Sequence, residues 1–514
     1  QNGSLQTMQV KEDLLDLSYF SRHELIGNQL LHYKGFDKEG NILKNKPDDY
    51  DYFSTGESDA YRPTYFSAFI NDRFTWKFID LSVGLRLDRF DANQPVMIDK
   101  YSLMEIRTAG EVTEFNGEPV SHPSNIGDEY RVYVDNYANP SAIVGYRNED
   151  IWYNADGNEI ETPTMLGDES GPYLKYPDIY FLSDGWKPEM SFKDYEPSIY
   201  LLPQADLQLN SKYGYFYVRY SSFSSNPNTA YSIYRPEQYF IWNQLGNSIR
   251  QNPGLKPYRI DKFLMGGKPR IYKSLFADLS FQKTTLKNYY AFKYFDGAWP
   301  LSYFTVVNME DPIDFESYTA ALQYFDQDRS GVSGSISLTK NSITEGDNKF
   351  LEMSDLVMNN FLIFEFGRGN TFLLGNNNTI RNIFEDFSVG LFHQFRHGTP
   401  LPELEYEDQN YTVSPDFHTT SLRVEKGHYF EKAEFYLGLY LYIENLLNSK
   451  NVYYIDPKTG EPDDDGYLTS PEWQQEIEEQ TNSESYRYLY ALHQKNPAYY
   501  ARPRIFKLGF VFSF

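Results

Sequence analysis

The segment 504–514 constrains the fold of this chain more than any other stretch of its sequence. Every second residue from Phe506 to Phe514 is large and apolar, and the residues between are mostly small or polar. Successive side chains of a strand point to opposite faces, so one face of this strand is entirely apolar. Such an edge would promote aggregation in water, but a strand that faces lipid requires it. We therefore predict a transmembrane barrel strand in the outer membrane, with Phe510, Phe512 and Phe514 as its assembly signal.

The composition favours membrane-spanning strands over membrane-spanning helices. Aromatic residues make up 18% of the 514 residues, with 46 Tyr and 38 Phe. The mean hydropathy is negative, and no apolar run approaches the roughly 20 residues that a membrane-spanning helix needs. A barrel that is apolar and girdled by aromatic residues outside, with a polar interior and polar loops, accounts for both observations.

The charge and the absence of cysteine exclude several kinds of function. The chain has 72 acidic and 47 basic residues, and its formal net charge is −25. Without a basic stripe to neutralise phosphates, nucleic acid is not expected as a partner. With 0 cysteines, disulfides and thiol chemistry are excluded. No arrangement typical of a catalytic site stands out, so we do not expect an enzyme.

Alternation with a period of two recurs along the chain, over segments of the length that a tilted transmembrane strand requires. In 81–88, for example, Leu81, Val83, Leu85 and Leu87 alternate with small or polar residues. We predict an all-β fold, an antiparallel transmembrane barrel with about fourteen visible strands. Apart from the terminal segment 504–514, these strands are 65–78, 81–88, 198–210, 212–223, 258–267, 270–282, 288–294, 301–307, 316–326, 332–339, 360–367, 384–395, 417–424 and 435–444.

The connections between the predicted strands alternate between short and long. Short breaks occur at 76–80 and 210–212, whereas 91–197 and 445–499 are long and polar. This alternation is typical of a barrel with short periplasmic turns and long extracellular loops, which we expect to be unstructured. No linker argues for a second domain.

Three motifs appear in order along the chain. The first motif consists of Asn71 and Asp72 in one predicted strand and Gly84, Arg86 and Asp88 in the next. The second motif is Asn252-Pro253-Gly254-Leu255-Lys256-Pro257, and the third is Asn445-Leu446-Leu447-Asn448. With the aromatic terminus they resemble the barrel of TonB-dependent outer-membrane receptors, particularly the large branch with an N-terminal regulatory-like domain. The resemblance covers 61–514, nearly the whole chain.

The resemblance implies a barrel of roughly 22 strands with a plug inside it, import driven through TonB, and outer-membrane lipid as the surroundings. No plug-like segment and no TonB box is found in the sequence. We therefore expect 61–514 to be the C-terminal part of the barrel, and 1–60 to hold extracellular loop and strand remnants. Contact with TonB would pass through an N-terminal region outside this chain.

The motif residues also have a purely structural interpretation. Arg86 and Asp88 lie on the strand face opposite the leucines, where they can pair with each other or with a plug. In the second motif the prolines fix the backbone and Gly254 permits a tight turn. Asn445 and Asn448 can end a strand by bonding nearby backbone.

Two further groups are candidate binding residues. Asp463, Asp464 and Asp465 lie in an acidic loop that could hold a structural calcium ion, although the spacing does not match an EF-hand; no other cofactor is expected. Tyr231, Tyr234 and Tyr239 belong to an aromatic, polar loop of the kind that contacts ligands. Tyrosines of an interfacial girdle would look the same in sequence.

Three functions are compatible with this sequence. The first is the barrel of a TonB-dependent receptor that imports a large or scarce ligand. The second is a receptor-like scaffold in an outer-membrane assembly or secretion complex, whose long loops dock surface or periplasmic lipoprotein subunits. The third is a passive porin without a plug.

Overall fold

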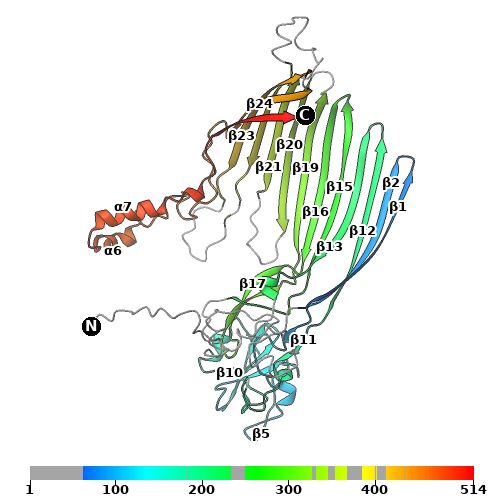
Figure 1. Ribbon diagram of the computed structural model, residues 1–514. Helices are drawn as coiled ribbons and strands as arrows, with labels where there is room; N and C mark the ends of the chain where they lie inside the picture. The colour runs from blue at the N-terminus through cyan, green and yellow to red at the C-terminus, as the bar shows by residue number, and fades with distance from the viewer. Residues whose placement is uncertain are drawn as a thin grey trace, which may run out of the picture.

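The fold is built around one large antiparallel sheet (Figure 1). The computed structural model describes residues 62–181, 183–232, 249–326, 331–344, 354–366, 385–399, 401, 413–432 and 434–513. The predicted remnants at 1–60 and the residues Tyr234, Tyr239 and Phe514 lie outside this described part. Within it, no helix is long and apolar enough to cross a membrane.

Thirteen strands form the main sheet, and each pairs antiparallel with the next one along the chain that belongs to this sheet. They are β1 (Thr64–Trp76), β2 (Ile79–Asp91), β12 (Ser198–Ser211), β13 (Gly214–Ser225), β15 (Tyr258–Tyr272), β16 (Leu275–Lys287), β19 (Ile313–Asp326), β20 (Val332–Thr344), β21 (Leu356–Phe366), β22 (Phe387–Arg396), β23 (Phe417–Phe430), β24 (Phe435–Glu444) and β25 (Ile505–Ser513). The all-β, antiparallel prediction is confirmed. β1 and β25 are the two edges of the sheet, and no pairing between them is found among the described residues.

Short and long connections lie at opposite ends of the sheet, as predicted. Because neighbouring strands run in opposite directions, the tight turns at 77–78, 212–213 and 273–274 share one end. The long connections, among them 92–197 and 445–504, leave from the other end. The connection 367–386 is the exception, since it is long but belongs to the end with tight turns.

The register gives the sheet two different faces. On one face, Leu279 of β16 stands beside Ala320 of β19, which stands beside Leu338 of β20. On the opposite face, the neighbouring row is Ser280, Thr319 and Thr339. Apolar rows of the first kind continue to β25, where Leu441 pairs with Leu508 and Leu439 with Phe510. We call these the apolar face and the polar face.

Two details of the predicted strands are wrong. A turn was expected between 267 and 270, but β15 continues to Tyr272 and the turn lies at 273–274. The two glycines of this region leave space for aromatic side chains of the neighbouring strand. A Cβ at Gly267 would lie 2.4 Å from the ring of Phe216, and one at Gly266 would lie 2.7 Å from the hydroxyl of Tyr217. The segments 288–294 and 301–307 are strands, but they leave the main sheet. They form β17 (Tyr290–Phe295) and β18 (Tyr303–Asn308), which pair with β14 (Ile249–Arg250) in a separate sheet.

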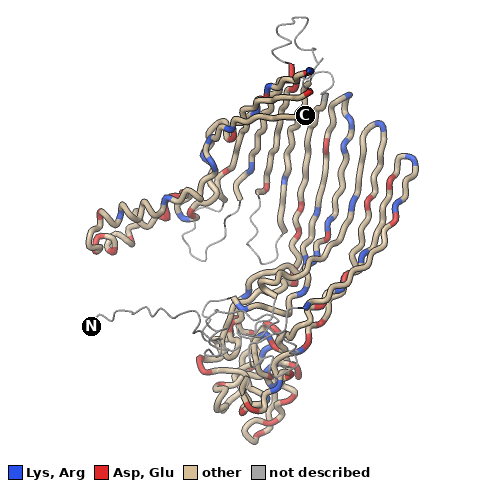
Figure 2. The backbone as a smooth tube through the Cα atoms, viewed as in Figure 1, with Lys and Arg blue, Asp and Glu red and all other residues tan. Residues whose placement is uncertain are grey.

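The connection 92–197 is folded, contrary to the expectation of an unstructured loop. It carries a five-stranded sheet of β6 (Arg131–Val134), β7 (Ile143–Asn148), β8 (Ile151–Asn154), β9 (Glu159–Ile160) and β10 (Gly171–Pro172). The smaller elements are β3 (Pro95–Met97), η3 (Ala109–Glu111), β4 (Glu114–Phe115), β5 (Glu118–Pro119), η4 (Pro163–Leu166), η5 (Pro188–Met190) and β11 (Phe192–Asp194). We call this region, together with β14, β17 and β18, the mouth domain. It lies at the lower end of the sheet in Figure 1, and its charged residues are numerous (Figure 2).

The core of the mouth domain is aromatic and contains one buried ion pair. Tyr101, Tyr133, Trp152 and Phe295 pack together, so that β17 is joined to the folded connection. Arg147 is 3% exposed, and its guanidinium binds Asp99 at 2.5 Å and the hydroxyl of Tyr133 at 3.0 Å. The guanidinium carbon also lies 4.4 Å from the ring centre of Tyr101. The sequence did not predict this core, because its residues belong to short segments that lie far apart along the chain.

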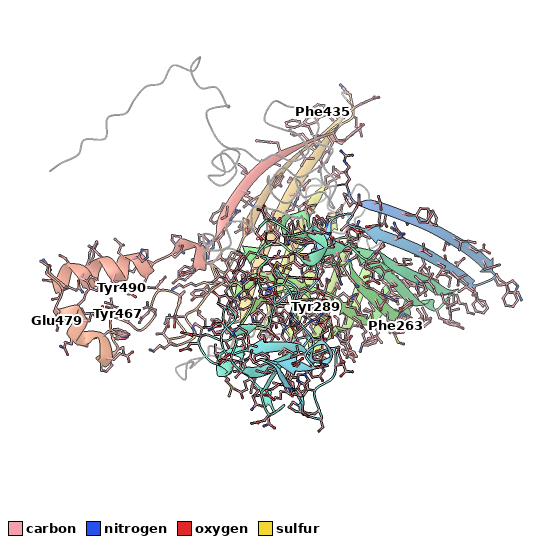
Figure 3. All side chains as sticks on the ribbon, turned by 90° about the horizontal axis from the view of Figure 1, so that it is seen from below. Phe263, Tyr289, Phe435, Tyr467, Glu479 and Tyr490 are labelled. Carbon is pink, nitrogen blue, oxygen red and sulfur yellow. The ribbon has the colours of Figure 1, made fainter. Side chains whose placement is uncertain are left out.

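A helical arm projects from the connection between β24 and β25 (Figure 1). It consists of η7 (Pro471–Trp473), α6 (Gln474–Glu478) and α7 (Ser483–Gln494), and η8 (Pro497–Tyr499) follows it. Ile477 is fully buried between the helices. Figure 3 shows the labelled rings of Tyr467 and Tyr490 close together in this arm, with their centres 4.7 Å apart.

Candidate functional site

The first motif builds a hydrogen-bonded cluster on the polar face. Arg86 donates from Nε to Oδ1 of Asp88 at 2.7 Å, which is the pairing expected from the strand alternation. Asp88 is 2% exposed, and it also accepts from the hydroxyls of Ser67 at 2.7 Å and Ser224 at 2.8 Å. A buried carboxylate held by several donors is rigid. This cluster therefore ties β1, β2 and β13 together near the mouth domain.

The other residues of the first motif lie further along the same hairpin. The Asn71 side chain accepts from Ser82 at 3.2 Å. A Cβ at Gly84 would lie 2.8 Å from Oδ1 of Asn71 and 2.6 Å from Nε2 of Gln204, so glycine makes room for both amides. Asp72 pairs with Val83 and so belongs to the apolar face, where its carboxylate accepts from the backbone N–H of Arg73 at 2.8 Å.

The second motif connects the main sheet to the mouth domain. Asn252 donates to the carbonyl of Val306 in β18 at 2.9 Å, and its own side-chain oxygen accepts from the N–H of Gly254 at 2.9 Å. Leu255 is fully buried, and its carbonyl accepts from the hydroxyl of Tyr195 at 3.2 Å. A Cβ at Gly254 would lie 2.7 Å from Val96, so the glycine permits a close approach between two segments.

The last residues of the second motif complete this connection. The N–H of Lys256 donates to the Asn308 side chain at 2.8 Å, and the carbonyl of Lys256 accepts from the hydroxyl of Tyr290 at 3.0 Å. The carbonyl of Pro257 accepts from Tyr200 of β12 at 2.9 Å. Pro253 lies between these contacts in the same turn. The motif is thus a structural junction, since its bonds reach β12, β17 and β18.

The third motif fixes the start of β25. Asn445 and Asn448 have φ values of 52° and 54°, in the left-handed region that asparagine tolerates. Asn445 donates to the carbonyl of Ser449 at 2.9 Å and to that of Arg502 at 3.3 Å. The N–H of Leu446 donates to the carbonyl of Thr420 in β23 at 2.6 Å. Asn445 bonds backbone nearby in the sequence, as its structural interpretation predicts.

The terminal aromatic residues lie on the apolar face. Phe510 pairs with Leu439 and Phe512 with Leu437. Phe510 is 64% exposed, so the edge strand presents its rings outward. Their role as an assembly signal stays a prediction.

An aromatic patch lies on the mouth domain, and of its residues only Tyr231 was predicted from the sequence. Phe292 and Tyr294 of β17 share one face of the small sheet with Phe304 of β18, and Ile249 of β14 stands beside Phe304. All four are exposed. The ring centres of Tyr294 and Phe304 are 4.5 Å apart, and the predicted residue Tyr231 meets Phe292 edge-on at 6.0 Å. We call these five residues the aromatic patch; apart from Tyr231, its sequence signal was the period-two alternation of aromatics in 290–295.

The acidic loop is bonded to the helical arm and to the segment that leads into β25. Asp465 accepts from Tyr490 at 2.6 Å and from Gln494 at 2.9 Å. Asp463 accepts from the hydroxyl of Tyr500, and Asp464 accepts from the N–H of Gly466 at 2.8 Å.

Burial and the neighbouring carboxylates raise the pKa of Tyr490 and of Tyr500 to about 12. Across the residues that the structure describes, no group of three or more His, Asp or Glu side chains is placed to hold a metal ion. The calcium hypothesis therefore finds no support in the geometry of Asp463, Asp464 and Asp465.

Aromatic residues and lysines mark the end of the sheet that has tight turns. Lys77 lies 5.0 Å from the ring centre of Trp76, Lys212 lies 4.9 Å from that of Tyr213, and Lys273 lies 5.3 Å from that of Tyr272. Tyr and Trp with a nearby lysine are typical of a membrane–water interface.

Together these features define the class of fold: long antiparallel strands in a meander, with an exposed apolar face, a polar face, and long connections at one end. This is the fold of outer-membrane β-barrel proteins. No model of a known protein family matches the chain, and no curated protein matches it.

Solved structures of similar shape include a copper transporter and a ferric-catecholate import receptor. The copper transporter OprC has 12% identity over 75% of this chain and 43% of OprC, with a TM-score of 0.38. The ferric-catecholate import receptor Fiu from K12 E. coli, in its closed form, has 11% identity over 76% of this chain and 41% of Fiu, with a TM-score of 0.39.

A third similar structure is the hemophore receptor HasR of Serratia marcescens, a double mutant in complex with its hemophore HasA and heme. It has 12% identity over 77% of this chain and 50% of HasR, with a TM-score of 0.42. This chain spans between about two fifths and half of the lengths of these three proteins.

Proposed function

We propose that this chain is the membrane-embedded part of a TonB-dependent outer-membrane receptor that imports a large or scarce ligand. The observation that carries the proposal is the two-faced sheet. The apolar residues of β2 run from Ile79 to Leu87, close to the roughly 9–11 residues that cross a bilayer in a tilted strand. Polar groups such as the Arg86–Asp88 pair then lie on the face turned away from lipid.

In this proposal, 61–514 is the C-terminal part of the barrel. A plug and the segment that contacts TonB would be supplied by sequence outside it. The long connections would face the exterior of the cell, so the mouth domain would be the first part of the chain that an arriving ligand meets.

The aromatic patch is the proposed first contact for the ligand. Exposed rings supply large contact areas at little cost in conformational entropy, and they suit ligands with flat or apolar surfaces. The ligands of the similar structures (copper, a ferric catecholate and a heme-loaded hemophore) are the first probes to test. Replacement of Phe292, Tyr294 and Phe304 by alanine should weaken binding of the active probe at least tenfold, whereas Tyr180→Ala, an exposed aromatic elsewhere in the mouth domain, should not.

Membrane fractionation tests the proposed location. The native protein should sediment with the outer membrane, resist extraction by high salt and require detergent to stay dispersed. Its migration in gels should change on heating, as folded barrels resist the detergent of the gel until they are heated. A protein that stays monomeric in plain buffer would contradict the proposal.

A scaffold role is favoured by one observation, the outer surface of the helical arm. Tyr488, Leu489 and Leu492 of α7 are exposed and lie on one side of the helix at spacings typical of a helix that docks into a groove. A scaffold would co-purify with a stable partner, and replacing these three residues by alanine would release that partner without affecting import.

A further inference from the structure

The apolar face of the main sheet contains a hollow of about 720 Å³. It extends over six neighbouring strands, from β12 to β20, and its surface is almost entirely apolar. Side chains that line it include Leu207, Phe216, Met265, Leu279, Tyr318 and Leu338. The hollow lies opposite the polar face, so it is separate from the Arg86–Asp88 cluster and from the aromatic patch.

Small residues among large ones account for the hollow. On the apolar face, Gly267 pairs with both Phe216 and Leu279, and Ala320 pairs with both Leu279 and Leu338. These two positions provide almost no side chain, whereas their neighbours are large. The surface is therefore lower at Gly267 and Ala320 than around them.

One end of the hollow coincides with the limit of the apolar face. The cross-strand row Phe281, Tyr318 and Lys340 is followed, towards the long connections, by the row Lys283, Glu316 and Ser342. A charged residue on the lipid side of a barrel is costly at the middle of the membrane and tolerated near its surface. In β16, β19 and β20, the row of Tyr318 and Lys340 therefore marks the membrane–water interface on the side of the long connections.

The two lysines at this limit differ in their partners. Lys283 forms ion pairs with Asp314 at 2.8 Å and Glu316 at 3.5 Å. Lys340 is exposed and lines the hollow, and among the described residues no carboxylate is within ion-pair distance of it. A positive charge that is beyond ion-pair distance of every described carboxylate thus stands where an apolar hollow reaches the interface.

We propose that this hollow binds an acyl chain of an anionic lipid in the leaflet on the side of the long connections, with the lipid phosphate beside Lys340. An apolar hollow in a surface bathed by hydrocarbon accommodates a chain of methylene groups, and a lysine at the interface attracts a lipid phosphate. The phosphate and the chain come from one lipid molecule, because the lysine and the apolar lining belong to one hollow. The inference rests on the proposed membrane location.

The test uses the full native receptor, purified in detergent and reconstituted in nanodiscs of phosphatidylcholine with a minor fraction of phosphatidylglycerol. Native mass spectrometry counts the phosphatidylglycerol molecules retained by each variant. Ala320→Phe fills the hollow and Lys340→Gln removes the charge. Ile336→Phe is the matched control, because it adds an aromatic ring to the same face beside a second, smaller hollow of about 350 Å³. The change of gel migration on heating verifies that each variant is folded.

We expect Lys340→Gln to reduce retained phosphatidylglycerol about fivefold, the effect of roughly one lysine at a membrane surface. Ala320→Phe should also reduce retention, because its ring occupies the hollow, and Ile336→Phe should have no effect. The proposal would be overturned if folded Ala320→Phe or Lys340→Gln protein retained as much phosphatidylglycerol as the unchanged receptor. Displacement of the lipid by inorganic phosphate alone would also overturn it. A co-purified protein segment that cross-links into the hollow would also overturn it. Protein that remains dispersed without detergent would instead refute the membrane location.

Discussion

Asn448 accepts a hydrogen bond at 2.9 Å from the backbone N–H of Arg504, which lies 56 residues further along the chain. The bond holds both ends of the connection between β24 and β25 together, directly before the terminal strand begins. A long connection with a helical arm thus starts and ends at one point, and β25 is set in register beside β24.

Replacing Asn448 by alanine should loosen the terminal strand. The change removes this bond and leaves a side chain with a Cβ at a φ of 54°, which together cost about 1–3 kcal/mol. The temperature at which gel migration changes should fall. Asn448→Gly is the matched control, because glycine tolerates the backbone angle and loses only the bond. If both variants lowered this temperature equally, the backbone angle would contribute nothing to the stability of the terminal strand.

Replacing Gly254 by alanine should detach the mouth domain from the sheet. The new Cβ would lie 2.7 Å from Val96, so the junction formed by 252–257 must shift. Limited proteolysis should then cut between the two parts at a protease concentration that leaves the original protein intact. The double variant Gly254→Ala with Val96→Ala provides space and should restore resistance. Persistent cleavage in the double variant would contradict the steric explanation.

The mouth domain should depend on its buried ion pair. Arg147→Met leaves Asp99 in the interior without its main partner, and breaking a buried pair in this way costs about 3–5 kcal/mol. Hydrogen exchange in β6 and β7 should accelerate while exchange in the main sheet stays unchanged. Arg147→Lys keeps the charge and should have a smaller effect. Unchanged exchange in the Met variant would show that aromatic packing alone maintains the core.

The helical arm should lose stability at high pH. The pKa of Tyr490 is raised to about 12, above the ordinary value of about 10, so the folded arm keeps this proton longer than the unfolded arm. The stabilisation is complete below about pH 10. It declines as the pH rises towards 12, where the folded arm also deprotonates. Difference absorbance at 295 nm between the original protein and Tyr490→Phe isolates this titration, and Asp465→Asn should shift it to lower pH. A titration unaffected by Asp465→Asn would contradict the assigned bond.

Local pattern made most of the main sheet predictable. Alternation in 79–91 and 505–513 depends only on which residues face lipid, so the strands follow from neighbours along the chain. The predicted strand 258–267 ended too early at Gly267, and the packing role of Gly266 and Gly267, which leave space for Tyr217 and Phe216, depends on β13. The pairing of β17 with β18 and the core around Arg147 likewise require contacts between distant segments.

The candidate site was less predictable than the sheet, because its contacts join segments that are distant in the sequence. The motif residues were found in sequence, but their roles as a junction and as strand ends depend on partners such as Tyr195 and Arg504. Asp465 resembled a metal ligand until Tyr490 and Gln494 were placed beside it. In sequence, Phe292 and Tyr294 look like strand residues of the main sheet, and only the pairing of β17 with β18 places them in a separate sheet.

The central claim, that hydrocarbon covers one face of the sheet and water the other, is tested most directly by site-directed spin labelling along β2. The chain has 0 cysteines, so single cysteines can be placed without a background at Ser82, Val83, Leu85 and Arg86 and labelled in nanodiscs. We expect Val83 and Leu85 to be accessible to dissolved oxygen and protected from a water-soluble nickel reagent, and we expect the reverse at Ser82 and Arg86. Equal access of the nickel reagent at all four positions would contradict the central claim.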